Sequence, residues 1–314
     1  MKKNIWNTPV EWQGLSARKG YDQKFLLCGS CFADRVGQKL QRSRFHATVN
    51  PCGIAFDPLS LARHAEHSLQ QLKPNANDII HHDGLWHSMQ FHGSFSYADQ
   101  QETLRKINIA MDTLRHALQT ADVIVFTFGS AWYLQHRENQ QPITNAHKLP
   151  SEHFRKKLAT VEQITEGLST LIALIHEQNS TAEVIISVSP VRYLRDGIEG
   201  NMRSKARLIE SAHQLRESNQ QVHYFPAYEM VMDELRDYRW YAEDMLHISQ
   251  VAVDHIWEKF RQGTFHNECI TMMDRIEPLI QFIEHRPIHN SAEDHAKQCS
   301  LKEQEIQDLL TTRN

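Results

Sequence analysis

Four runs of consecutive apolar residues are spread along the chain, and each has the length of a β-strand. They cover residues 25–28, 123–128, 184–188 and 222–225. Strands that are buried on both faces of a parallel sheet have this continuous apolar character, whereas strands with one wet face alternate between apolar and polar positions. The four runs therefore predict a buried parallel sheet.

Segments between these runs have apolar residues at helical spacing. One stripe consists of Ile107, Ala110, Met111, Leu114 and Leu118, and another of Val161, Ile164, Leu168, Leu171 and Ile175. Strands that alternate with helices in this way predict an α/β fold, a three-layer doubly wound sandwich with a parallel central sheet. Such sheets bind ligands beyond the carboxyl ends of their strands.

Two further regions are expected to extend this core. Residues 75–97 contain glycines and aromatic residues in the pattern of a short hairpin, which predicts an insertion that roofs the site. Helical spacing of apolar residues continues past residue 264. We therefore expect a main domain over residues 1–264 and a helical extension over residues 265–314 that packs on or near it.

Composition and charge argue against several classes of protein. The chain has 314 residues, 40% of them hydrophobic, and no linker divides it, so one large core is expected. A net charge of −4 lacks the basic footprint of nucleic-acid binding. No stretch approaches the roughly eighteen apolar residues of a membrane span. The five cysteines, an odd number, argue against a disulfide framework. We expect a cytoplasmic protein without a nucleic-acid or membrane partner; the oligomeric state stays open.

A hydroxyl and a thiol follow the first apolar run. Gly29, Ser30 and Cys31 stand where the run gives way to a helical pattern. Unpaired N–H groups and the dipole at a helix N-terminus favour negative charge, so this position can lower the pKa of a thiol and stabilise an oxyanion. The corner is a candidate for covalent catalysis, although small residues at such a turn also suit tight packing.

An aspartate and a histidine stand three positions apart much further along the chain. They are Asp244 and His247, and Ser249 follows them in the position of an N-cap, before an amphipathic helix. A carboxylate behind an imidazole fixes its tautomer and stabilises the imidazolium that forms when it takes a proton. Nucleophile, base and orienting group are therefore all present in the sequence.

With these motifs and four others in the same order, the sequence resembles the GSCFA-domain proteins, a family within the wider SGNH, or GDSL-like, hydrolase superfamily. The resemblance covers roughly residues 24–262 and implies an SGNH, flavodoxin-like fold. It rests on Gly29-Ser30-Cys31-Phe32-Ala33, Asn50-Pro51-Cys52-Gly53-Ile54, Phe126-Thr127-Phe128-Gly129-Ser130-Ala131-Trp132, Asn145-Ala146-His147-Lys148, Ser189-Pro190-Val191-Arg192 and Asp244-Met245-Leu246-His247.

The resemblance implies roles for the reacting groups. The first block of SGNH hydrolases reads Gly-Asp-Ser, and an alignment without a gap places Cys31 on the nucleophilic serine. A thiol nucleophile is chemically reasonable because a thiolate needs less help from a base. A shift of one residue would make Ser30 the nucleophile instead. His247 is implied to be the base and Asp244 its orienting group.

The resemblance also implies an incomplete oxyanion hole. Gly53 matches the second-block glycine, whose N–H donates to the oxyanion. The third block normally reads Gly-x-Asn, but here the matching stretch is Gly129-Ser130-Ala131, so the asparagine donor is missing. Asn145 and His147 are the candidate substitutes, and the alternative is that both are turn residues.

Other polar residues have weaker signals. Arg192, with Arg203 and Lys205, is a candidate for binding an anionic or sugar substrate, and the alternative is a solvated helix face. Cys28 and Cys31 have the spacing of a redox motif, but Cys28 is expected to point into the core. The histidines of residues 81–87 lack the fixed spacing of a structural zinc site. We expect no metal and no cofactor.

These observations lead to one hypothesis and one alternative. The hypothesis is an SGNH-like acyl-transfer enzyme, either an esterase or an O-acyltransferase, that acts on a small-molecule or carbohydrate-linked ester. The alternative is a non-catalytic carbohydrate- or anion-binding protein that retains the fold. The missing asparagine favours the alternative, and the intact Asp244 and His247 pair argues against it.

Overall fold

The computed structural model of the protein describes residues 7–285 and 292–312. Its centre is a sheet of five parallel strands in the order β10-β9-β5-β1-β2. These strands are β1 (Lys24–Gly29), β2 (His46–Val49), β5 (Val123–Phe128), β9 (Glu183–Val188) and β10 (Val222–Phe225). Counted along the chain, this is the 2-1-3-4-5 order of flavodoxin-like folds, with its switch point between β1 and β5. The predicted fold class is confirmed, and β2 joins the four strands that the apolar runs predicted.

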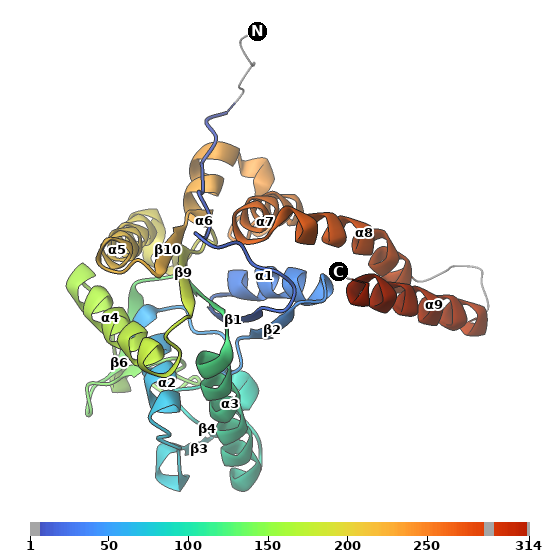
Figure 1. The fold of residues 1–314 in the computed structure, drawn as a ribbon. Coiled ribbons are helices and arrows are strands. Elements are labelled where there is room, and N and C mark those ends of the chain that lie inside the picture. Colours follow the sequence, from blue (N-terminus) through green and yellow to red (C-terminus); the bar gives the residue numbers. More distant parts are fainter. Residues whose placement is uncertain (1–6, 286–291, 313–314) are drawn as a thin grey trace.

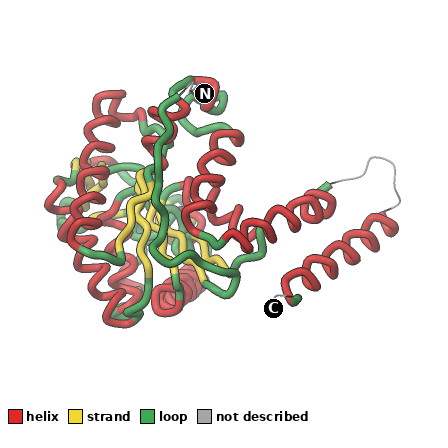
Figure 2. The backbone as a smooth tube through the Cα atoms, turned by 45° about the horizontal axis from the view of Figure 1, so that its top comes forward, coloured by secondary structure: helices red, strands yellow, loops and turns green. Residues whose placement is uncertain are grey.

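Helices cover both faces of the sheet (Figures 1 and 2). One face carries α2 (Pro58–Leu69), α3 (Gln100–Thr120), α4 (Val161–Gln178) and α5 (Gly197–Ser218), and the other carries α1 (Cys31–Arg42) and α7 (Gln250–Thr264). Several of these helices begin at residues whose side chains accept from the first free N–H groups. Asp57 caps α2 and Thr160 caps α4, and Ser249 caps α7, as the sequence predicted.

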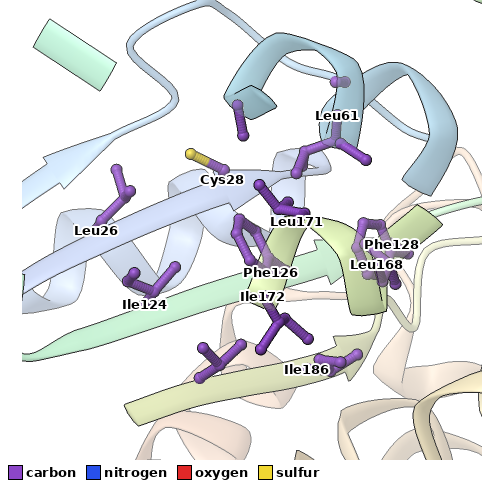
Figure 3. Close-up of a cluster of buried hydrophobic side chains, with 14 of the residues drawn as sticks. Leu26, Cys28, Leu61, Ile124, Phe126, Phe128, Leu168, Leu171, Ile172 and Ile186 are labelled. Carbon is purple, nitrogen blue, oxygen red and sulfur yellow. The ribbon is translucent and has the colours of Figure 1, made fainter. Parts of the chain in front are cut away.

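Successive residues of each strand contribute to opposite sides of the sheet, which gives two hydrophobic clusters. In β1, Leu26 and Cys28 belong to the cluster beneath α2, α3 and α4, whereas Phe25 and Leu27 belong to the cluster beneath α1 and α7. Figure 3 shows the first cluster, with Cys28 among its apolar neighbours. Because full burial of one such side chain contributes about 1.5–3 kcal/mol, the strands form a rigid frame for their carboxyl edge.

Two small antiparallel sheets lie outside the central one. The hairpin of β3 (Ile80–His82) and β4 (Leu85–His87) falls within the insertion expected at residues 75–97. A three-stranded sheet of β6 (Trp132–His136), β7 (Pro142–Ile143) and β8 (Phe154–Leu158) follows β5. Short helical turns complete the chain: 3₁₀ turns Ala76–Asp78, Gly93–Phe95, Ser151–His153, Leu194–Asp196 and Tyr238–Trp240, α6 (Ala227–Glu229) and a π-helix Met230–Leu235.

Two helices form the C-terminal part of the chain, α8 (Asn267–Glu284) and α9 (Ala292–Thr311). They lie side by side at the right of Figure 1. Ile276 of α8 and Ile306 of α9 are buried in the same cluster as α1, and Arg42 of α1 pairs with Glu277 and Glu284 at 2.5 and 3.0 Å. Within the described residues, every helix is too short or too polar to span a lipid bilayer.

Candidate active site

The corner between β1 and α1 requires a glycine. Gly29 has φ +134°, and a Cβ built on it would lie 2.0 Å from the carbonyl oxygen of Thr127 on β5. Its N–H donates to Oδ1 of Asn50 at 2.8 Å, and the Asn50 side chain also donates to Asp34 of α1 at 2.6 Å. One glycine without a side chain thus lets three segments meet at the switch point of the sheet.

Ser30 and Cys31 have different environments at this corner. Ser30 is the N-cap of α1, and its hydroxyl accepts from the N–H of Phe32 at 3.3 Å and shares a 3.0 Å hydrogen bond with the Thr127 hydroxyl. Its side chain is buried. Cys31, the first residue of α1, is half-buried and free. The Ser30 hydroxyl is therefore occupied in holding the corner, and the thiol is the more accessible of the two candidate nucleophiles.

The pKa of the Cys31 thiol is shifted in the direction opposite to the one expected. Burial, followed by the nearby Asp34 carboxylate, raises this pKa; the Cys31 N–H, Arg35 and Lys205 lower it but do not outweigh the first two. The expectation that the helix N-terminus would lower the thiol pKa considered only the favourable charges. Desolvation of the thiolate outweighs them at this partly buried position.

Gly53 does not offer the free donor that was expected. Its N–H donates to the carbonyl oxygen of Asn50 at 2.8 Å and closes a turn. Its φ is +82°, and a Cβ there would lie 2.6 Å from Cβ of His92, so this position also requires glycine. The expectation of an N–H directed into the cavity is wrong for this structure, because the turn that follows β2 uses that group.

The stretch after β5 is held by backbone and side-chain hydrogen bonds. The N–H groups of Gly129 and Ser130 both donate to the carbonyl oxygen of Phe56, at 2.9 and 3.1 Å. Ala131, which stands where SGNH hydrolases have asparagine, donates its N–H to the Ser204 hydroxyl at 2.7 Å. Gly129 and Ser130 therefore shape the corner, and their N–H groups are not free to bind a ligand.

Lys205 lies beneath the same stretch, in contrast to the solvated helix face considered from the sequence. Its side chain is 1% exposed, and Nζ donates to the carbonyl oxygens of Gly129 at 2.6 Å and Ser189 at 2.7 Å. A sequence signal exists: Lys205 shares the stripe of Leu208 and Ala212, which are buried on α5. Sequence reasoning treated the lysine as a surface charge and missed that face.

Asn145 and His147 support the insertion rather than an oxyanion. Oδ1 of Asn145 accepts the His147 N–H at 2.9 Å, which is a turn contact. The buried His147 ring hydrogen-bonds through Nε2 to the carbonyl oxygen of Ser88 at 2.8 Å, and burial is the main cause that lowers its pKa. The turn alternative fits both residues.

Asp244 and His247 form the pair that their spacing predicts. Oδ2 of Asp244 lies 2.6 Å from Nδ1 of His247, and Oδ1 accepts the N–H groups of Leu246 and His247, both at 2.9 Å. The His247 contact, above all, lowers the pKa of Asp244 to about 2. Both side chains are about half exposed, so the carboxylate fixes the imidazole in a loop that faces solvent.

Arg192 holds this loop against the end of β9. Its N–H donates to the carbonyl oxygen of Leu246 at 3.0 Å. Its guanidinium lies 4.1 Å from the ring centre of Tyr241 and 4.9 Å from that of Tyr238. Cation–π contacts therefore engage the face of this guanidinium, and the anion-binding role considered from the sequence stays a prediction.

The carboxyl edge of the sheet thus carries both halves of the expected site. Cys31 follows β1, and the loop of Asp244 and His247 is bonded to the segment after β9. No hydrogen bond joins the Cys31 thiol to the His247 imidazole among the described residues. Within the same residues, no three His, Cys, Asp or Glu side chains are grouped as a metal ion would require.

The molecule is a doubly wound α/β sandwich. It carries a cysteine at the switch point of the sheet and a bonded Asp–His pair at the same edge. The chain belongs to the GSCFA family, whose family model matches residues 24–260. No sequence among the curated proteins matches it.

Similar solved structures are distant. They include a Streptococcus pneumonia protein provisionally named a platelet activating factor, with 12% identity and TM-score 0.41 over 76% of this chain and 83% of that one. A family two carbohydrate esterase from Clostridium thermocellum has 11% identity and TM-score 0.38 over 84% and 67%. An acetyl xylan esterase from Butyrivibrio proteoclasticus has 11% identity and TM-score 0.26 over 66% and 56%. Likenesses this distant say nothing about the substrate of this chain.

Proposed function

We propose that the protein is an acyl-transfer enzyme, an esterase or O-acyltransferase, that uses Cys31, His247 and Asp244 on a small or carbohydrate-linked ester. The observation that carries the proposal is the 2.6 Å contact of Asp244 with Nδ1 of His247. This contact leaves Nε2 as the nitrogen that can exchange a proton at the edge of the sheet where Cys31 begins a helix.

The reaction would proceed in two steps. Nε2 of His247 takes the Cys31 proton as the sulfur attacks the ester carbonyl, and the N–H of Cys31 at the helix N-terminus donates to the oxyanion. The C–O bond then breaks, and the alcohol leaves with the proton from His247. Water or a second alcohol next attacks the thioester, gives its proton to His247 and releases the acyl group from a restored thiol.

The reaction needs one contact that the described hydrogen bonds do not include. The His247 imidazole has to come within hydrogen-bond distance of the thiol, and contacts of this kind are often long in ligand-free sites. The loop permits such movement because the side chains of Asp244 and His247 are about half exposed. The substrate class rests on the resemblance, and five cysteines, an odd number, fit a reducing, cytoplasmic location better than a disulfide framework.

A specific observation favours a second candidate, a binding protein without turnover. The third-block asparagine is absent, and the N–H of Gly53 is already bonded to Asn50. Each lost oxyanion donor typically costs about 10²–10³-fold in rate. Such a protein would bind a carbohydrate ester but would not cleave it.

Steady-state hydrolysis of p-nitrophenyl acetate and of an acetylated sugar distinguishes the acyl-transfer enzyme from the binding protein. Cys31→Ala and His247→Gln are each expected to lower kcat about 10³-fold or more, whereas Cys299→Ala, which removes a half-buried thiol on α9, is the matched control and keeps the wild-type rate. Binding of the acetylated sugar with no turnover above that of Cys31→Ala would support the binding protein and contradict the enzyme.

A further inference from the structure

A cavity of about 300 Å³ lies between α2, the insertion at residues 75–97 and the small sheet of β6 and β7. These elements meet in the lower half of Figure 1. The volume is at the lower end of the range for small-molecule sites, which is about 300–1,000 Å³. No residue of the candidate active site lines this cavity, so the proposed acyl-transfer reaction does not explain it.

Four basic side chains line the cavity. Arg63 and His67 are one turn apart on α2, Lys73 lies in the loop after α2, and His136 ends β6. Lys73 is already paired with Asp112 at 2.8 Å. Arg63 and the two histidines are therefore the basic groups that are available to a ligand.

Arg63 is a half-buried guanidinium without a carboxylate partner among the described residues. Nη1 donates to Oε1 of Gln141, which is a neutral amide, and Nε is buried without an acceptor. Burial lowers the pKa of Arg63, and the nearby Glu66 opposes that shift but does not outweigh it. Because a charge out of water is costly unless an opposite charge compensates it, this guanidinium favours an anion.

Two other polar atoms of the lining residues are buried without a partner among the described residues: Nδ1 of His136 and Oε1 of Gln90. The same turn holds both residues, since the His136 N–H donates to the carbonyl oxygen of Gln141 at 2.9 Å and the Gln90 amide donates to that of Pro142 at 3.1 Å. Buried polar groups are nearly always paired. Donors and an acceptor that gather around one cavity indicate a ligand with both acceptor and donor groups.

We propose that this cavity binds a small phosphate monoester that also carries hydroxyl groups, such as a sugar or polyol phosphate. The phosphate accepts from the Arg63 guanidinium and from His67 and His136, and a hydroxyl donates to Oε1 of Gln90. Three basic groups match a phosphate, which has three acceptor oxygens and up to two charges, better than a carboxylate with two oxygens and one charge.

The electrostatics of the lining agree with this proposal. Asp78 is its acidic residue, and Oδ2 of Asp78 accepts the Asn75 N–H at 2.8 Å. Burial, followed by Arg63, lowers the pKa of His67, and Asp78 opposes this shift. A bound anion would favour the charged forms of both Arg63 and His67, which otherwise disfavour each other.

Isothermal titration calorimetry at constant ionic strength tests the proposal with glycerol 3-phosphate as the probe. Its affinity is expected to exceed that of D-glycerate and of glycerol at least about tenfold, because these ligands replace the phosphate with a carboxylate or with a hydroxyl. Arg63→Gln is expected to weaken binding about 10–100-fold. Arg63→Lys retains the charge without the planar fork and should lose less.

The controls separate a lost site from a lost fold. Arg105→Gln, which removes an exposed arginine of α3 that pairs with Glu102 at 2.6 Å, is the matched variant and should keep the wild-type affinity. Circular dichroism reports whether Arg63→Gln folds. If it does not, His136→Gln carries the test, and this variant is expected to weaken binding about tenfold.

Absence of binding at millimolar glycerol 3-phosphate would overturn the proposal, and so would an affinity that folded Arg63→Gln and His136→Gln both leave unchanged. Tighter binding of D-glycerate would overturn the phosphate assignment in favour of a carboxylate. Cys31→Ala is expected to bind glycerol 3-phosphate as the wild type does, so failure of this site and failure of the acyl-transfer function are distinguishable.

Discussion

The β1–α1 corner and the loop of Asp244 and His247 solve the same problem, the placement of one reactive group, in different ways. At the corner, Gly29 is bonded to Asn50 and would clash with Thr127 if it had a side chain, so the buried core fixes the cysteine. In the loop, Asp244 itself accepts two N–H groups and orients the imidazole, and both side chains are about half exposed.

This difference indicates which property, stability or rate, a substitution in each region will change. A change at the corner alters the packing of β1 against β5 and is expected to reduce stability first. A change in the loop breaks contacts that solvent already reaches, and exposed ion pairs contribute about 0–1 kcal/mol to stability. The loop should therefore govern rate with little influence on the fold.

The largest effect is expected from Gly29→Ala. The new Cβ would lie 2.0 Å from the Thr127 carbonyl oxygen in a backbone conformation with φ +134°, so the free energy of unfolding should fall by more than about 4 kcal/mol. Gly84→Ala, at φ +75° with open space around it, is the control, and its cost should be about 1–2 kcal/mol. Urea unfolding measures both, and equal losses would contradict the role given to the corner.

Asp244→Asn tests the opposite side of the comparison. Loss of the carboxylate removes the group that fixes the tautomer of His247, so kcat should fall about 10²–10⁴-fold, while the free energy of unfolding changes little, because solvent screens an exposed pair. Asp237→Asn alters a nearby exposed carboxylate, which pairs with Arg239, and should leave the rate unchanged. A large loss of stability in Asp244→Asn would mean that the loop is part of the frame.

A smaller effect is expected from Arg192→Leu. The guanidinium stacks on Tyr241 and Tyr238, and loss of such contacts costs about 1–2 kcal/mol. Hydrogen exchange of the amides of residues 242–248 should become roughly tenfold faster, with the core amides unaffected. Arg195→Leu removes an exposed neighbouring charge and should leave the exchange rates of both the loop amides and the core amides unchanged. Unaltered exchange in Arg192→Leu would show that the N–H of residue 192 holds the loop by itself.

The smallest effect concerns acid. Hydrogen bonds from His247 and from two backbone N–H groups lower the pKa of Asp244 from 3.8 to about 2. A depressed folded pKa contributes stability that is present above the unfolded value near 3.9 and is lost as pH falls toward 2. Carboxyl ¹³C NMR should therefore show Asp244 still ionised at pH 3, and His247→Gln should return its midpoint toward 3.8. A midpoint near 4 in the wild type would contradict the bonded pair.

The sequence predicted the parts of the molecule that follow local periodicity. Strands β1, β5, β9 and β10 appear as continuous apolar runs, and the N-cap of α7 was expected at Ser249. β2 was missed because it has four residues, none of them fully buried. This short edge strand forms through its pairing with β1. Local sequence does not reveal that pairing.

The site divides in the same way. Asp244 and His247 are three residues apart, so their contact follows from local geometry. The N–H of Gly53 and the burial of Lys205 depend on how distant segments close over them, and single-sequence reasoning assigned both incorrectly. The predicted direction of the Cys31 pKa shift was wrong for a related reason, because desolvation is set by packing from several elements.

The central claim, that the thiol of Cys31 forms the acyl-enzyme, is tested most directly by brief exposure to an activated acetyl ester, acid quenching and peptide mass spectrometry. The predicted result is an acetyl group on Cys31, lost in Cys31→Ala and retained in Ser30→Ala, with Cys299 unmodified. An acetyl group on Ser30, or on neither residue, would contradict the account.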